Sequence, residues 1–273
     1  MWQTTADGRS LPRSRFVVLL SACLAVGCQY GAYFFRDTRR PMEAVEVRMD
    51  PGVRRSCLLV FMPGMLNLPD AYVEHGFVAD AVRASRRCDI VLADAHFGYY
   101  RDRTLARQVG QDILLVADER GYSDIWLVGS SLGGMGAVMV AREHPERIAG
   151  IVLFGPFFGD DALIRSIEDA GGLDGWDGGA GNGPSVFDPE PTALWSWLRG
   201  YATHPDRMPP LYVGVGADDG MRSGVDLLAS HLPETHLGLA PGGHAWASWR
   251  VLWRRLLASP PWDPRASPPR IDR

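Results

Sequence analysis

The stretch Ile125 to Gly134 reads Ile-Trp-Leu-Val-Gly-Ser-Ser-Leu-Gly-Gly and joins an apolar run to the motif G-x-S-x-G. In a nucleophile elbow, a serine sits on a sharp turn between a strand and a helix, and the residues two before and two after it must be small. Gly129 and Gly133 meet this requirement. The motif therefore makes Ser131 the candidate nucleophile.

The residues on either side of the motif supply the structural context that it needs. Upstream, Asp124 to Val128 is a short apolar run typical of a buried parallel strand. Downstream, an apolar helical face continues until His144-Pro145 ends it. A plain tight turn whose serine only caps the helix is the alternative. The strand, turn and helix in sequence favour the elbow.

A candidate acid and a candidate base follow the serine in the chain. The apolar run Leu211 to Gly216 predicts a strand and leads into Ala-Asp-Asp-Gly, which contains Asp218 and Asp219. A later strand predicted over Thr235 to Leu239 is followed by Pro-Gly-Gly-His, which ends at His244. The chain order is therefore serine, aspartate, histidine.

This order and the elbow motif resemble the α/β-hydrolases of the esterase and lipase type, over about residues 46–253. The resemblance implies a triad of Ser131, Asp219 and His244, because family members commonly place the acid three residues after a strand-ending glycine, here Gly216. Asp218 stays open as the acid, as do Asp160 and Asp161 after the strand predicted at 148–154. His96 is a further histidine at the same sheet edge, with a pocket-lining or a purely structural role.

The resemblance also implies an oxyanion hole made of two backbone N–H groups. One belongs to Leu132, the residue after the candidate nucleophile. The other is expected from Met65, in the loop after the strand Cys57 to Met62. Relatives usually have His-Gly in this loop, whereas this chain has Pro63-Gly64, which leaves the Gly64-Met65 backbone available but removes a histidine that often orders the loop.

The composition fits one globular domain. The chain has 273 residues, of which 46% are hydrophobic and 22% charged, and its net charge is −4, which argues against a nucleic-acid partner. Alternating strand-like and helix-like runs predict an α/β fold with about seven mostly parallel strands and helices on both faces. Val45 to Met49 is expected to pair antiparallel with Cys57 to Met62. Helices are expected at 70–85, 104–119, 132–143, 224–230 and 246–257.

A segment of about 50 residues between the strands at Ile151 and Leu211 is too long for a simple connection. It predicts a lid insertion at about 156–209 within a catalytic domain spanning 41–259. Aromatic side chains in and near it either cover the core or wall an acyl pocket; they are Phe97, Tyr99, Tyr100, Trp195 and Trp197. The proline-rich tail, 260–273, is expected to be disordered.

Residues 1–40 have the pattern of an export signal, in which arginines precede an apolar run. The run ends in Leu-Ala-Val-Gly-Cys, which resembles a bacterial lipobox with Cys28 as the lipidated residue. Cys23 matches a similar motif after a shorter apolar run. An uncleaved transmembrane anchor over Phe16 to Phe35 is the other interpretation. Each predicts an exported bacterial protein attached to the membrane on its periplasmic or extracellular side.

Two cysteines remain in the exported domain, and they open two strands that are sheet neighbours in this fold. In parallel register, Cys57 and Cys88 would face each other across about 4.8 Å, within the range that a disulfide accepts. Two buried free thiols are the alternative.

The function expected from this reading is hydrolysis of a carboxylic ester through an acyl-enzyme, with no metal or organic cofactor. A thioesterase, an acyltransferase and a serine peptidase would use the same residues. A catalytically silent, membrane-tethered binding protein is the interpretation from another class, and Pro63 is the feature that keeps it open. The expected partners are an ester substrate and the membrane.

Overall fold

The computed structural model describes residues 33–50, 52–84, 87–178, 187 and 190–263. The chain divides into two compact units, residues 1–37 and 38–273. The first unit is described only from Tyr33 onward, so Cys23, Cys28 and almost all of the predicted anchor lie outside the described residues. The second unit holds the sheet and the helices that cover it.

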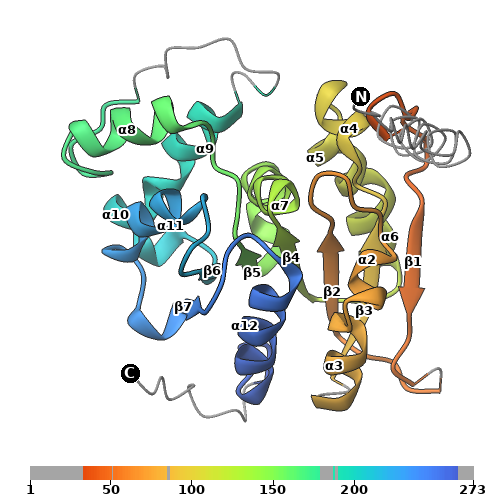
Figure 1. Cartoon of the computed structure of the whole chain (residues 1–273). Coiled ribbons are helices and arrows are strands. Elements are labelled where there is room, and N and C mark those ends of the chain that lie inside the picture. The colour runs from red at the N-terminus through yellow and green to blue at the C-terminus, as the bar shows by residue number, and fades with distance from the viewer. Residues whose placement is uncertain (1–32, 51, 85–86, 179–186, 188–189, 264–273) are drawn as a thin grey trace, which may run out of the picture. The chain divides into compact units, whose positions relative to one another are not determined.

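A seven-stranded sheet lies at the centre of the second unit, in the order β1-β3-β2-β4-β5-β6-β7 (Figure 1). Every neighbouring pair is parallel except β1 with β3. The prediction of about seven mostly parallel strands is confirmed. The strands are β1 (Ala44–Val47), β2 (Cys57–Met62), β3 (Cys88–Ala93), β4 (Asp124–Ser130), β5 (Ile148–Phe154), β6 (Leu211–Gly216) and β7 (Leu237–Ala240).

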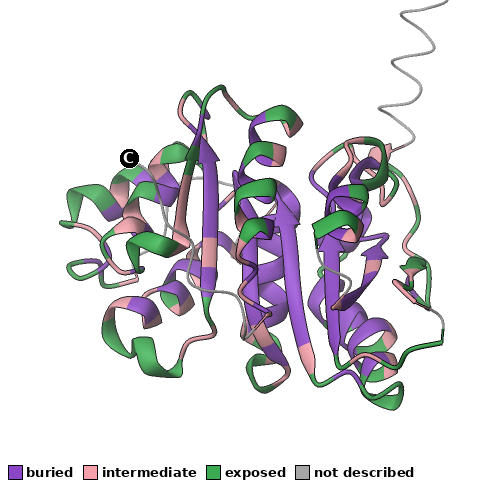
Figure 2. Ribbon diagram, turned by 90° about the horizontal axis from the view of Figure 1, so that it is seen from below, coloured by how far each residue is buried: buried purple, intermediate pink, exposed green. Residues whose placement is uncertain are grey.

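The central strands are buried on both faces, as their continuous apolar sequences predict (Figure 2). In β2, Leu58 and Val60 contribute to one apolar cluster, and Leu59 and Phe61 to the other. This alternation follows from the two-residue period of a strand. The sheet therefore separates two cores and presents the ends of its strands at the edges.

Helices cover each of these faces. The core that contains Phe61 is closed by α2 (Ala71–Glu74), α3 (Phe77–Ala84) and α12 (Trp246–Ala258). The remaining helices supply apolar side chains to the other core: α4 (Phe97–Arg101), α5 (Leu105–Val109), α6 (Leu115–Glu119), α7 (Leu132–Glu143), α8 (Asp161–Asp169), α9 (Glu190–Leu198), α10 (Gly200–Thr203) and α11 (Arg222–Ala229). A π-helical turn, Gly110–Leu114, joins α5 to α6.

The predicted antiparallel pairing of Val45 to Met49 with Cys57 to Met62 is wrong. Strand β1 pairs instead with β3, with Val45 opposite Leu92. Both edges of β2 are already occupied by the parallel neighbours β3 and β4, so it offers no free edge. The outer edge of β3 is the one that remains for β1.

The prediction that all of residues 260–273 are disordered is also wrong for the first residues of that segment. Trp262 is buried, with its ring 5.7 Å from that of Trp126 and 5.8 Å from that of Trp253. Two aromatic neighbours outweigh the proline-rich composition, because burying a tryptophan removes a large apolar surface from water. The packed unit therefore continues to Asp263, and the rest of the tail lies outside the described residues.

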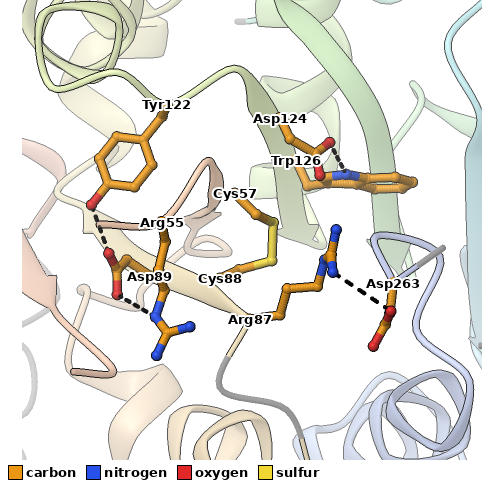
Figure 3. Close-up of a disulfide and its surroundings, with 9 residues drawn as sticks. All are labelled: Arg55, Cys57, Arg87, Cys88, Asp89, Tyr122, Asp124, Trp126 and Asp263. Carbon is orange, nitrogen blue, oxygen red and sulfur yellow. Dashed lines mark hydrogen bonds and ion pairs between the residues drawn. A yellow bond between two sulfur atoms is a disulfide. The ribbon is translucent and has the colours of Figure 1, made fainter. Parts of the chain in front are cut away.

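A disulfide joins Cys57 to Cys88 at the start of β2 and β3, where the two residues are direct register partners with 4.4 Å between their Cα atoms (Figure 3). Both cysteines are buried. Polar contacts surround the bond: Tyr122 donates a hydrogen bond of 2.8 Å to Asp89, and Arg87 lies 3.7 Å from Asp263. The disulfide thus fixes the end of the sheet opposite to that from which Ser131 and Asp219 emerge.

Candidate active site

Ser131 occupies the sharp turn between β4 and α7 with φ of 53° and ψ of −120°. A positive φ is strained for a residue other than glycine, and it persists only where the surroundings hold it. The flanking glycines make the turn possible. A Cβ at Gly129 would lie 2.3 Å from the Gly133 carbonyl oxygen, and one at Gly133 would lie 2.0 Å from the Met62 carbonyl oxygen. The elbow predicted from the motif is therefore present in the structure.

The structure brings Ser131, His244 and Asp219 into one line of hydrogen bonds. Ser131 Oγ lies 2.9 Å from His244 Nε2, and His244 Nδ1 lies 2.9 Å and 3.0 Å from the two oxygens of Asp219. In the tautomer protonated on Nδ1, the imidazole donates to the carboxylate and accepts from the serine hydroxyl. This geometry can draw the proton from Ser131 and stabilise the imidazolium that results.

Asp219 reaches this position from the turn after β6. Its side chain is fully buried, and one of its oxygens also accepts a 2.9 Å hydrogen bond from the Met221 amide. Burial by itself raises the pKa of Asp219, but the hydrogen bonds from His244 and Met221 outweigh burial and keep that pKa below its ordinary value. The carboxyl group is therefore ionised when the imidazole needs a counter-charge.

The other candidate acids do not contact the imidazole. Asp160 caps α8 by accepting a hydrogen bond from the Leu163 amide, and the Asp161 side chain is 86% exposed. Asp218 is the immediate neighbour of Asp219, and its amide donates to the Gly242 carbonyl. Of the aspartates left open by the sequence, Asp219 is the one whose carboxylate contacts the His244 imidazole.

A glycine and a tryptophan lie behind the acid and the base. Gly155, just after β5, has φ of 50°, and a Cβ there would lie 2.7 Å from Asp219 Oδ2 and 3.1 Å from His244 Nδ1. The ring of Trp249 packs edge-on against the imidazole at 4.8 Å between centroids, and its indole nitrogen is buried. The imidazole is thus held by packing as well as by its hydrogen bonds.

The two amides expected to bind an oxyanion lie beside Ser131. Leu132 begins α7, and Met65 belongs to the loop after β2, whose Gly64 comes so close to the elbow that a Cβ there would lie 3.1 Å from Ser131 Cβ. Within the described part of the chain, neither the Leu132 nor the Met65 amide donates a hydrogen bond to a protein acceptor.

Two buried tyrosines contact the framework of the site: Tyr72, which the sequence did not single out, and Tyr100, one of the aromatics expected to cover the core or wall a pocket. The Tyr72 hydroxyl lies 2.9 Å from the Met62 carbonyl oxygen and 3.0 Å from Ser130 Oγ. The Tyr100 hydroxyl donates to the Leu132 carbonyl at 3.0 Å. In the sequence, Tyr72 looks like an ordinary apolar position of a helix, so no local signal distinguishes it.

Other residues singled out from the sequence have structural roles. His96 is buried, and its Nδ1 accepts a hydrogen bond from the Gly98 amide at the start of α4. Trp195 is fully buried in α9 and donates its indole N–H to the Phe158 carbonyl. Tyr99 is also a core side chain. These residues cover the core rather than form an acyl pocket. The segment between β5 and β6, where a lid was expected, holds α8, α9 and α10.

A cavity of about 490 Å³ adjoins the triad without including it. Its walls come from the segment after β5 and the segment after β6, and the lining residues Gly220 and Met221 directly follow Asp219. Phe157, another lining residue, donates its amide to the Ser131 carbonyl at 3.0 Å. Residues that line the cavity therefore adjoin both Ser131 and Asp219, and most of the lining side chains are apolar.

Neither a metal site nor a membrane-spanning helix occurs in the part of the chain that the structure describes. Among the described residues, no group of three or more histidine, cysteine, aspartate or glutamate side chains could hold a metal ion. No helix within the same residues has both the length and the apolar character needed to cross a membrane.

Comparison with known proteins agrees with this architecture. No curated protein matches the chain by sequence. Among the solved structures that share the fold are three that match over nearly their whole length. They are Est1E from Butyrivibrio proteoclasticus (17% identity, TM-score 0.54, 79% of this chain and 91% of that one), a ferulic acid esterase (14%, 0.53, 79% and 96%), and an S-formylglutathione hydrolase from Staphylococcus aureus (13%, 0.51, 82% and 97%).

A family model described as the alpha/beta hydrolase fold matches residues 58–212, which is more than half of the chain. The matched segment includes β2 to β5, the elbow at Ser131 and the insertion after β5. Asp219 and His244 follow it in the chain, and their hydrogen-bonded line with Ser131 completes the pattern expected of the fold. The chain therefore belongs to the α/β-hydrolase family.

Proposed function

We propose that this protein is a serine hydrolase that cleaves a carboxylic ester through an acyl-enzyme. The observation that carries the proposal is the unbroken line of hydrogen bonds from Ser131 through His244 to the buried, ionised Asp219. A binding module has no need for a serine held at a strained φ against an imidazole. The esterase-like structural neighbours support the same reading at the level of the fold.

In the first half of the reaction, Ser131 Oγ attacks the ester carbonyl carbon while His244 Nε2 takes its proton. The negative charge that develops on the carbonyl oxygen is received by the Met65 and Leu132 amides. The tetrahedral intermediate then collapses, the carbon–oxygen bond to the alcohol breaks, and His244 returns the proton to the leaving alkoxide. An ester between Ser131 and the acyl group remains.

In the second half, His244 removes a proton from water, and the hydroxide attacks the acyl carbon. The bond to Ser131 Oγ breaks, the serine recovers its proton from His244, and the carboxylic acid leaves. Asp219 keeps the imidazole in the required tautomer in both halves. Every proton transferred in this sequence passes through His244.

The direct test is Ser131→Ala assayed on p-nitrophenyl esters of graded acyl length. Turnover should fall to the background rate while the melting temperature stays close to that of the wild type, since the elbow accepts a small side chain. Ser166→Ala is the matched control, because Ser166 is a half-buried serine of α8 whose hydroxyl binds only the Leu163 carbonyl. Unchanged turnover in Ser131→Ala would refute the proposal. Thioesters and amides assayed beside the esters define the acyl group and leaving group that the enzyme prefers.

We also propose that the protein is exported and attached to a bacterial membrane, with lipidation at Cys28. The Cys57–Cys88 disulfide supports export, because such bonds persist mainly in oxidising compartments. Radiolabelled palmitate added to a bacterial host should label the full chain and should not label Cys28→Ser. If labelling is lost only in Cys23→Ser, the lipidation site is Cys23. If the full chain is not labelled at all, a transmembrane anchor is favoured.

A further inference from the structure

Tyr72 connects two parts of the site whose spacing must stay fixed: the loop that contains Met65 and the turn that contains Ser131. It lies in the short helix α2, directly after the loop that contains Met65, and its side chain is fully buried. Its single hydroxyl is within hydrogen-bond distance of the Met62 carbonyl, which precedes that loop, and of Ser130 Oγ, which precedes the nucleophile.

The direction of these hydrogen bonds follows from what each group can do. The Met62 carbonyl can only accept, so the one phenolic proton goes to it. Ser130 can donate, so its hydroxyl proton goes to the phenolic oxygen at 3.0 Å. Burial raises the pKa of Tyr72 well above its ordinary value, which keeps the phenol protonated.

Each partner of Tyr72 adjoins a part of the site. The bond to Met62 closes the loop 63–71 on itself, because it joins the residue before the loop to the residue after it. The bond to Ser130 fastens that closed loop to the last residue of β4. At the same place, a Cβ on Gly64 would lie 3.1 Å from Ser131 Cβ, so the loop and the elbow pack against each other with no space between them.

The ring of Tyr72 is fixed independently of its hydroxyl. It packs edge-on against Phe61, Phe77 and Trp246, with centroid separations of 4.8 Å, 5.5 Å and 5.1 Å. Replacing tyrosine with phenylalanine would leave these contacts in place and remove only the two hydrogen bonds. The effect of the hydroxyl can therefore be measured separately from that of the ring.

We propose that Tyr72 is a positioning residue that sets the distance between the Ser131 nucleophile and the Met65 oxyanion amide. This inference rests on the proposed function. Donors in an oxyanion hole stabilise the transition state only when they already point to where the charge develops. Loss of the Tyr72 hydroxyl would let the loop shift relative to the elbow, so the transition state would lose stabilisation while ground-state binding would not.

The test compares Tyr72→Phe with Tyr201→Phe. Tyr201 is a matched control, because its buried hydroxyl also donates to a backbone carbonyl, that of Pro209 at 2.7 Å, before β6 begins. Two measurements are made on each full-length variant. One is kcat and KM on a p-nitrophenyl ester, and the other is the rate constant and final extent of labelling by a fluorophosphonate. The extent reports the folded fraction, and the rate constant reports the geometry of the site.

Removing a whole oxyanion donor costs about 100- to 1,000-fold in turnover, so a misplaced donor should cost less. For Tyr72→Phe we expect kcat and the labelling rate constant to fall about 10-fold, with KM and the extent of labelling unchanged. For Tyr201→Phe we expect wild-type rate constants.

A Tyr72→Phe variant that reacts at the wild-type rate would overturn the inference. So would an equal loss of rate in Tyr201→Phe, or a loss confined to the extent of labelling, because either would mean that the hydroxyl only stabilises the fold. If the wild type itself does not react with the fluorophosphonate, the proposed function fails, and the positioning role fails with it.

Discussion

At the scale of single residues, Asp219 has the environment that the acid of a triad needs, because its buried carboxylate accepts hydrogen bonds from both His244 and the Met221 amide. Asp219→Asn removes the charge that stabilises the imidazolium and favours the wrong tautomer of His244. Turnover should fall by on the order of 10⁴, the effect measured in the best-studied triad. Asp218→Asn, at the neighbouring position, should be mild. The kcat of each variant relative to the wild type, measured on one ester, tests both expectations. A larger loss in Asp218→Asn than in Asp219→Asn would assign the acid to Asp218.

Gly155 is the second residue whose identity the site requires. Gly155→Ala would place a methyl group 2.7 Å from Asp219 Oδ2 at a backbone φ of 50°, so the carboxylate or the imidazole must move. A displacement of about 1 Å in a catalytic group can cost about 100-fold in rate. We therefore expect kcat to fall by about that factor.

The control for this variant is Gly52→Ala, because a Cβ at Gly52 would have one neighbour, at 3.8 Å. Near-normal turnover in Gly155→Ala would contradict this prediction, because it would show that catalysis tolerates a displaced Asp219 or His244.

At the scale of elements, the position of His244 depends on α12, which begins two residues later. Asp80 of α3 holds α12 through hydrogen bonds from Arg250 at 2.6 Å and Arg254 at 2.9 Å, and Arg83 adds a third at 2.6 Å. The hydrogen bond from Arg250 is the largest cause that holds the pKa of Asp80 far below its ordinary value, although burial opposes it. Asp80 thus stabilises the folded protein in its ionised form.

The pH dependence follows from the direction of that shift. The contribution of Asp80 is complete above the ordinary aspartate pKa of about 3.9 and is lost as the pH falls toward the lower value in the folded state. Asp80→Asn should therefore lower the melting temperature by a few degrees at pH 7 and by progressively less in acid. Thermal unfolding from neutral pH down to about pH 3 checks this.

Asp161→Asn, at a largely exposed carboxylate, is the matched control and should change little at any pH. A gap between wild type and Asp80→Asn that stays constant with pH would contradict the role given to the Asp80 charge.

The elements also show which features a sequence can predict. The elbow, the buried strands and α7 follow from local signals, because glycine spacing and apolar runs are properties of adjacent residues. The partner of β1 does not, since it depends on which strand edges other elements have already occupied. The need for glycine at position 110, where the π-helical turn begins, also comes from a distant residue, because a Cβ there would lie 2.4 Å from His144 Nε2.

The residues of the candidate site likewise fall into those that the local sequence predicts and those that it does not. Ser131, Asp219 and His244 are predictable because each follows a strand in a short motif. Tyr72 and Gly155 are not, because their roles arise from contacts with segments distant in the sequence. His96 stayed undecided for the same reason, and the structure shows it as a helix cap.

At the scale of the whole molecule, the Cys57–Cys88 disulfide constrains the unfolded chain across a sequence separation of 31 residues. A loop of this length corresponds to about 3.7 kcal/mol of stabilisation in the chain-entropy model. The double variant Cys57→Ala/Cys88→Ala should lose about that much free energy of unfolding in urea. Its kcat in the absence of urea should stay near that of the wild type, because the bond lies at the opposite end of the strands from the triad. Unchanged unfolding in urea would mean that the bond adds nothing to stability.

The central claim is that Ser131 is the nucleophile of a working triad. The most direct measurement is peptide mapping by mass spectrometry after reaction with a fluorophosphonate. The account predicts one adduct per molecule, carried by Ser131, and a reaction that slows greatly in His244→Ala and disappears in Ser131→Ala. An adduct on another residue, or a wild-type protein that stays unmodified while folded, would contradict it.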